Sequence, residues 1–172
     1  MEAVRAGEVR SLGVLFDRHH ASLYRFYVRI TGNRDWSEDL TQEVFSRMLR
    51  HRDTYRPGAR FTTWMYRIAR NAHIDQVRKR RREVALVDGW DGAAAPGEPL
   101  ERRQERALLR RALLALPQDK REVLVLSRFQ GMSCEEIGEL LGLETGSVRV
   151  RIHRALHGLR EIFFELTGRK AS

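Results

Sequence analysis

Apolar residues recur at intervals of three and four along most of this chain, and no stretch of strand length alternates between apolar and polar residues. Such spacing gathers apolar side chains on one face of a helix, whereas period two would indicate strands. The chain is therefore predicted to be all-α. Its longest uninterrupted apolar stretch, residues 112–116, is far shorter than the roughly 20 residues that cross a membrane, so no membrane span is expected.

One segment without helical periodicity divides the chain. Residues 84–100 are rich in Gly, Ala and Pro and carry three acidic residues and no basic one, while the sequence on either side is basic. We expect a flexible acidic linker here, joining two small helical domains at residues 1–83 and 101–172. The formal net charge of +9 is typical of proteins that bind phosphate polyanions.

The periodicity predicts three helices in the first domain and four in the second. The first domain should hold helices at about residues 11–30, from 35 or 37 to about 55, and from 61 into the basic run at 78–82. Thr62 is the expected N-cap of the third. The second domain should hold helices at about 101–116, 117–129, 133–141 and 146–166, with Gly131 and Gly142 as stops between the last three.

The last two of these helices have the pattern of a helix-turn-helix. Ser133 followed by Glu136 forms a capping box, and residues 142–145 form a turn of suitable length. In the final helix, Val148, Ile152, Ala155 and Leu159 share one narrow sector, which predicts the buried side. The opposite side carries small, basic and hydrogen-bonding residues suited to a major groove: Gly146, Arg149, Val150, His153, Arg154 and His157. The alternative is a plain α-hairpin with a solvated basic face.

The candidate catalytic and metal-ligating residues of this sequence lack the spacing or the accompanying motifs that such sites need. Cys134 is the only cysteine, which excludes an internal disulfide and a cysteine-cluster zinc site. His153, His157 and Glu161 recur every four residues, but eight residues of helix rise about 12 Å, too far for three ligands of one ion. The His pair at 19–20 has no nucleophile motif or Gly-rich loop beside it. No catalytic residue, cofactor or metal is expected, and an enzyme is the weakest hypothesis.

The second helix carries a polar stripe beside its apolar face. Asp39, Glu43, Ser46 and Arg50 lie along it, with Gln42 adjacent. Acidic residues in the first turns of a helix suit its dipole, and this pattern alone favours that structural explanation. The alternative is a polar surface that docks a partner protein.

The third helix combines aromatic residues at its start with a basic run at its end. Tyr55, Phe61, Trp64 and Tyr66 crowd the start, and residues 78–82 are all basic. Bases of single-stranded nucleic acid stack on such rings while cations follow the backbone. We interpret the basic run in this way, but a core position is the favoured interpretation for Trp64.

Three linked segments together resemble bacterial sigma factors of the extracytoplasmic-function (ECF) group. The segments are Asp39 to Phe45, Phe61 to Asp75, and Leu116 to Ala155 with its Gly146-Ser147-Val148-Arg149-Val150-Arg151-Ile152-His153-Arg154 run. The resemblance covers about residues 12–166 and implies a region-two domain, a linker and a region-four domain. It also implies a function in directing RNA polymerase core to promoters.

The resemblance assigns residues to three surfaces and names partners. The residues that the resemblance implies for binding the clamp coiled coil of the largest subunit of polymerase core are Asp39, Gln42, Glu43 and Phe45. Minus-ten DNA binding falls to Tyr55, Arg60, Phe61, Trp64, Arg67, Asn71, Arg78, Lys79 and Arg81. Minus-thirty-five DNA binding falls to Gly146, Ser147, Arg149, Val150, Arg151, His153 and Arg154. The polymerase flap and an anti-sigma factor are further implied partners, the latter able to hold a cytoplasmic protein at the membrane.

Two matters stay open at the level of sequence. The chain departs from the family pattern at Val150, where Ser is frequent, at Leu156, where Arg is frequent, and at Gly138, where Ala is frequent. These departures prevent any deduction of the promoter sequence. The alternative function is a stand-alone helix-turn-helix regulator that binds operator DNA as a dimer.

Overall fold

A computed structural model of the chain describes residues 1–80 and 99–168, with the side chain of Arg80 excluded. The predicted linker at 84–100 therefore lies almost entirely outside the described residues, as does Arg81. The described part consists of helices and turns without a strand, in agreement with the predicted all-α class.

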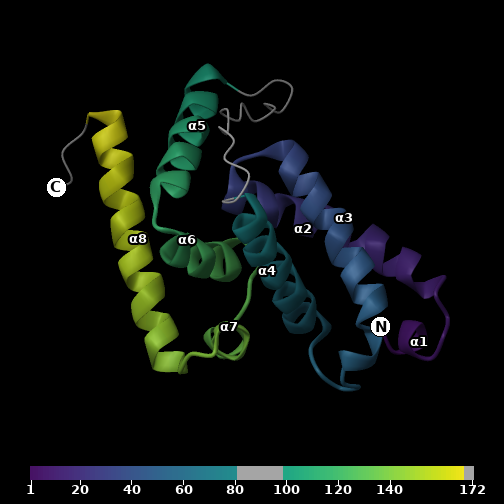
Figure 1. Cartoon of the computed structure of the whole chain (residues 1–172). Coiled ribbons are helices and arrows are strands. Elements are labelled where there is room, and N and C mark those ends of the chain that lie inside the picture. Colours follow the sequence, from purple (N-terminus) through teal and green to yellow (C-terminus); the bar gives the residue numbers. More distant parts are fainter. Residues whose placement is uncertain (81–98, 169–172) are drawn as a thin grey trace.

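The first four helices form an N-terminal group. They are α1 (Glu2–Arg5), α2 (Ser11–Thr31), α3 (Arg34–Arg50) and α4 (Phe61–Arg80), with a short 3-10 turn, η1 (Arg52–Thr54), between the last two. Helix α3 packs against both α2 and α4 (Figure 1). The short α1 was not predicted. Helix α4 begins at Phe61 and the Trp64 amide donates to the Arg60 carbonyl, so Thr62 is inside the helix and its prediction as N-cap was wrong.

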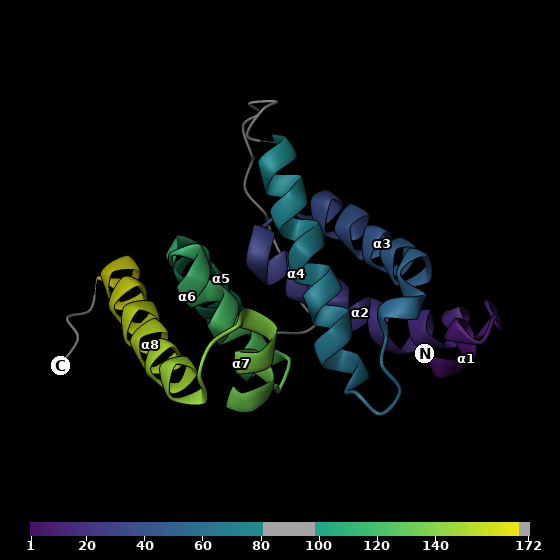
Figure 2. The ribbon, with the colours of Figure 1, turned by 60° about the horizontal axis from the view of Figure 1, so that its bottom comes forward.

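The remaining helices form a C-terminal group. They are α5 (Leu100–Ala115), α6 (Gln118–Leu124), α7 (Cys134–Leu141) and α8 (Thr145–Thr167). Helix α8 packs along α5 and α6 and meets α7 at its N-terminal end (Figures 1 and 2). Between α6 and α7, residues 125–129 form a π-helical turn, η2 (Val125–Phe129), where a regular helix was predicted. The Gln130 amide donates to the Val125 carbonyl across this wide turn.

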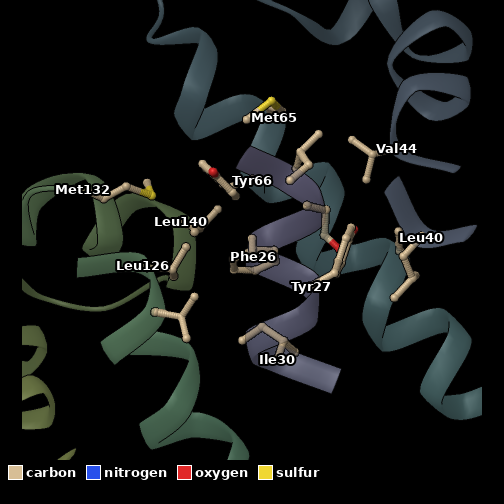
Figure 3. Packing of buried hydrophobic residues seen from close by; sticks show 14 of the residues in the cluster. Phe26, Tyr27, Ile30, Leu40, Val44, Met65, Tyr66, Leu126, Met132 and Leu140 are labelled. Atoms are coloured by element: carbon tan, nitrogen blue, oxygen red, sulfur yellow. The ribbon is translucent and has the colours of Figure 1, made fainter. Parts of the chain in front are cut away.

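The two groups share one hydrophobic cluster. Phe26 and Tyr27 of α2 lie at its centre, with Leu40 of α3 on one side and Leu126 and Leu140 of the C-terminal group on the other (Figure 3). The Tyr27 hydroxyl donates to the Ala69 carbonyl at 2.8 Å, so this buried polar atom is satisfied. The two helical groups are thus in direct contact, and α7 lies beside α4 (Figure 2).

Arg121 on α6 also joins the two groups. Its guanidinium donates to the Ile30 carbonyl in the last turn of α2 and to the Leu114 carbonyl at the end of α5, both at 2.5 Å, and to the Leu116 carbonyl at 2.9 Å. Carbonyl groups at helix ends have no intrahelical donor, so one side chain satisfies acceptors from two helices. Burial lowers the pKa of Arg121, although guanidinium remains charged at any physiological pH.

Candidate nucleic-acid interface

Helices α7 and α8 form the predicted helix-turn-helix. The Ser133 hydroxyl accepts from the Glu136 amide at 3.2 Å, and the Ser133 amide donates to the Glu136 carboxylate at 2.8 Å, which confirms the capping box. Gly142 ends α7 in the left-handed conformation, with φ of +69°. Local sequence signals therefore fix both ends of the first helix.

Gly138 permits the close approach of the turn that follows. A Cβ at this position would lie 2.6 Å from the Leu143 carbonyl oxygen, closer than real Cβ contacts allow. The Leu143 amide in turn donates to the Gly138 carbonyl at 2.9 Å. The departure from the family pattern at Gly138 thus has a steric explanation in this chain.

The N-terminal half of α8 presents a basic face to solvent. Val148 and Ala155 are fully buried, and Ile152 and Leu159 are half-buried, as the spacing predicted. All seven residues assigned to the minus-thirty-five surface are exposed: Gly146, Ser147, Arg149, Val150, Arg151, His153 and Arg154. Arg149 lies 3.8 Å from the exposed Glu135 carboxylate, a distance and exposure at which the pair contributes little. The fold leaves this face open for a partner.

The aromatic residues before and at the start of α4 pack against one another. Tyr55 and Trp64 are 7% and 8% exposed, and their ring centroids lie 5.4 Å apart. The Tyr55 hydroxyl donates to the Ala59 carbonyl, and the Trp64 indole N–H donates to the Thr54 hydroxyl. Trp64 is therefore a core residue, as the residues alone had indicated, and in this conformation neither ring offers a face to a base. Phe61 is half-buried beside both.

The cations of α4 and the turn before it fall into two groups. Arg78 and Lys79 are exposed near the end of the helix, and the neutral Asn71, also predicted to bind DNA, is exposed at its middle. Arg60, Arg67 and Arg70 instead pair with glutamates of the C-terminal helices. Arg70 was not among the predicted site residues, although its spacing of three from Arg67 on the same helix could have indicated it.

The four residues predicted to bind polymerase core differ in their exposure to solvent. Asp39 and Gln42 are exposed on α3. Glu43 accepts from Arg47 at 2.7 Å and from Arg50 at 2.9 Å, and these hydrogen bonds, that from Arg47 above all, lower its pKa. Phe45 is 6% exposed and packs against the Phe16 ring at 4.9 Å, so its side chain faces the interior rather than a partner.

Comparisons with known proteins match the two helical groups separately. The Sigma-70 region 2 profile matches residues 15–83, and the Sigma-70 region 4 profile matches residues 106–157. RNA polymerase sigma factor CarQ of Myxococcus xanthus is 38% identical over 96% of this chain and 97% of that protein. ECF RNA polymerase sigma factor SigW of Bacillus subtilis is 30% identical over 94% of this chain and 93% of that protein.

Solved structures give the same family. The sigma factor RpoE of Bartonella quintana, in complex with the anti-sigma factor NepR, superposes with a TM-score of 0.77 at 25% identity, covering 89% of this chain and 96% of that one. CnrH, in complex with the cytosolic domain of CnrY, has a TM-score of 0.73 at 27% identity, covering 94% and 92%.

Two domains with these matches define a promoter-recognition subunit of bacterial RNA polymerase. The chain belongs to the ECF group of the sigma-70 family and is a transcription initiation factor. The alternative of a stand-alone dimeric regulator is not favoured by these comparisons. None of the helices between residues 1–80 and 99–168 combines the length and apolar character needed to cross a lipid bilayer.

Proposed function

We propose that the exposed face of α8 reads the minus-thirty-five element as duplex DNA. The observation that carries this proposal is the exposure of one basic helix face above a buried stripe, directly after a capped first helix. Arg149, His153 and Arg154 supply hydrogen-bond donors to base edges and phosphates, and Val150 supplies an apolar contact of the kind that thymine methyl groups accept. Arg151, on another side of the helix, is placed to contact backbone phosphate.

The minus-ten element is bound by α4 and the loop before it. Arg60, Arg67, Asn71, Arg78 and Lys79 form the polar part of this surface, and Arg81 extends it beyond the described residues. In the packed arrangement, Tyr55 and Trp64 brace the loop and Phe61 lies at its edge. We infer that Tyr55 and Trp64 act here as positioning residues, and that the cations make the contacts with single-stranded DNA.

Polymerase core docks on the exposed polar side of α3. Asp39 and Gln42 are free to contact the clamp coiled coil, while Glu43 is held in place by two arginines and Phe45 anchors the helix from inside. Two of the four residues between Asp39 and Phe45 therefore contact the polymerase, and the other two hold α3 in position.

The partners of this chain follow from its family. They are RNA polymerase core, promoter DNA and an anti-sigma factor, since the sigma factor RpoE, of similar fold, is solved with such a partner. The protein acts in the cytoplasm, where the polymerase is, and it has no catalytic role of its own. Its specificity comes from holding two DNA-binding domains at a separation that polymerase docking sets.

The docking surface is tested by a charge change on α3. The double variant Asp39→Arg with Gln42→Arg should lose binding to polymerase core in a pull-down. Both side chains are exposed, so their replacement leaves the hydrophobic interior of this protein intact. Asp17→Arg with Gln104→Arg makes the same charge change at exposed positions outside α3 and should bind core normally. Core binding by the α3 variant at the level of the control would refute this docking surface.

A further inference from the structure

A groove between α2 and α5 is lined by arginines and apolar side chains. Its volume of about 530 Å³ lies within the range of about 300 to 1,000 Å³ that is typical of ligand pockets. Five arginines line it: Arg25, Arg29, Arg34, Arg106 and Arg110. The described residues of the groove include no acidic side chain, and none of them belongs to the surfaces proposed above for DNA or polymerase core. The groove therefore gathers positive charge that those surfaces do not use.

The apolar residues of the groove are only partly covered. Leu113 is buried, whereas Leu109 of α5 and Phe129 of η2 are 42% and 45% exposed. The guanidinium of Arg29 lies 4.2 Å from the centre of the Phe129 ring. Large apolar side chains that gather at an exposed site, with a polar rim, mark a place where another segment binds.

The charges on the α2 side of the groove repel one another. Burial, and to a smaller extent the positive charge of Arg25, lower the pKa of Arg29, although both guanidinium groups stay charged at physiological pH. A carboxylate between the two sides of the groove would relieve this repulsion, and a guanidinium can bind it with two parallel hydrogen bonds. The groove thus suits a ligand that carries an apolar ring together with carboxylates.

The sequence between the two domains contains a segment with this chemistry. Residues 88–91 read Asp-Gly-Trp-Asp, so that one aromatic ring stands between two carboxylates. Trp90 is the only aromatic residue between positions 81 and 98, which lie outside the described residues. The segment is complementary to the groove both in charge and in its single large apolar side chain.

The chain is long enough to bring this segment to the groove. Trp90 is nine positions before Pro99, and nine extended residues span about 30 Å. Leu109 is nine positions after Leu100, the first residue of α5, and therefore about 14 Å along the helix. On the other side, the ten positions from Arg80 to Trp90 span up to about 33 Å.

We propose that residues 88–91 dock in the groove between α2 and α5 of their own chain, with the Trp90 ring against Leu109 and Phe129 and the two aspartates on the arginines. A short tether keeps the segment at an effective concentration in the millimolar range, which a separate acidic partner does not reach. The docking does not depend on the roles proposed for α3, α4 and α8.

Quenching of tryptophan fluorescence by acrylamide tests the docking in the full-length protein. The other two tryptophans, Trp36 and Trp64, are each 8% exposed, so a neutral quencher reaches them poorly. The variant Trp90→Phe reports these two alone, and the difference between the unmodified protein and this variant is the emission of Trp90. A docked Trp90 is shielded from acrylamide, and a solvated one is not.

The charge contacts are tested by Arg25→Glu with Arg106→Glu, which reverses one exposed cation on each side of the groove. We expect acrylamide to quench Trp90 about fivefold less in the unmodified protein than in this variant. Arg18→Glu with Arg111→Glu makes the same change at exposed positions of the same two helices outside the groove, and it should leave Trp90 shielded.

Two further variants examine the apolar contact and the pairing of charges. Leu109→Gln should expose Trp90 to the quencher, whereas Leu100→Gln, at an exposed leucine of α5 that does not line the groove, should not. Asp88→Arg with Asp91→Arg should also expose Trp90. Combining these two changes with Arg25→Glu and Arg106→Glu should restore the shielding, because charges of opposite sign again face each other.

Loss of folding is distinguished from loss of docking by adding Trp90→Phe to each variant. Trp36 and Trp64 remain shielded as long as the domain around them is folded. Equal quenching of Trp90 in the unmodified protein and in the Arg25 and Arg106 variant would overturn the proposal. Shielding that none of the groove variants removes would place Trp90 elsewhere, and shielding that is lost on dilution would show docking into a second copy. Either result would overturn it as well.

Discussion

Gly138 and Leu143 lie so close together that any side chain at position 138 would collide with the Leu143 carbonyl oxygen, since a Cβ would approach it to 2.6 Å. The obstacle is backbone rather than the end of a flexible side chain, so the turn between α7 and α8 must shift to relieve it. The geometry of the helix-turn-helix thus depends on the absence of one methyl group.

Gly138→Ala should therefore destabilise the protein by about 1 to 3 kcal/mol, even though Ala is the better helix former. Gly146→Ala is the control, because it lies in the first turn of α8 and a methyl group added there would have no heavy atom within 4 Å, so it should be neutral or stabilising. Urea unfolding followed by circular dichroism measures both. Equal stability of the two variants would contradict the steric explanation.

Arg121 should contribute more to stability than any exposed arginine. Replacing it with Met leaves three carbonyl acceptors at the junction of α2, α5 and α6 without their donor. The expected loss in free energy of unfolding is about 2 to 4 kcal/mol. Arg128→Met, at an exposed position on η2, should change stability by less than about 0.5 kcal/mol. Comparable losses in the two variants would show that the Arg121 contacts are not stabilising.

His73 should make the folded state sensitive to mild acid. It is buried against the Trp36 ring and Gln118, and burial, with a smaller contribution from Arg121, lowers its pKa from 6.5 to about 4. The unfolded chain binds a proton at this residue below about pH 6.5, while the folded chain does not until about pH 4. The contribution of neutral His73 to the free energy of unfolding is therefore fully present above pH 6.5. As the pH falls toward 4, the free energy of unfolding decreases by up to about 3 kcal/mol.

Unfolding at pH 7, 6 and 5 in urea checks this expectation. The loss on acidification should be smaller in His73→Phe than in the unmodified protein, while His51→Phe, at an exposed position, should behave like the unmodified protein. An identical decline in all three proteins would mean that His73 is not the titrating group.

Arg149 and Arg151 should differ in the way they affect promoter selection. Both are exposed on α8, but Arg149 lies on the face assigned to base edges and Arg151 on another side. Arg149→Ala in the holoenzyme should cost about 1 to 3 kcal/mol and relax sequence preference at one position of the minus-thirty-five element. Arg151→Ala should weaken binding evenly across sequences and lower the salt slope by about one. A randomised duplex library distinguishes these outcomes, and uniform weakening by both variants would contradict the assignment.

Features that depend on nearby residues were predictable from the sequence. The all-α class, the capping box at Ser133, and the buried stripe that includes Val148 and Ala155 all follow from spacing within a helix or one turn. The core position of Trp64 also agreed with the interpretation drawn from the residues alone. In each case the signal and the structure that it specifies lie within a few residues of each other.

Features that depend on long-range packing were not predictable. Nothing in the local pattern pairs Arg67 with Glu139, or directs Arg121 to the Ile30 carbonyl, because these partners are 72 and 91 positions apart. The π-helical turn at Val125–Phe129 has the apolar spacing of an ordinary helix, so periodicity could not reveal it. Phe45 was assigned to a docking surface by resemblance, and the fold places its side chain in the interior.

The central claim, that this chain confers promoter recognition on RNA polymerase, is tested most directly by transcription in vitro. The purified protein is mixed with sigma-free bacterial polymerase core and genomic DNA, and the 5′ ends of the transcripts are sequenced. The account predicts start sites that share two upstream elements at fixed spacing and that are absent without the protein. A folded protein that binds core and DNA yet yields no such shared elements would contradict it.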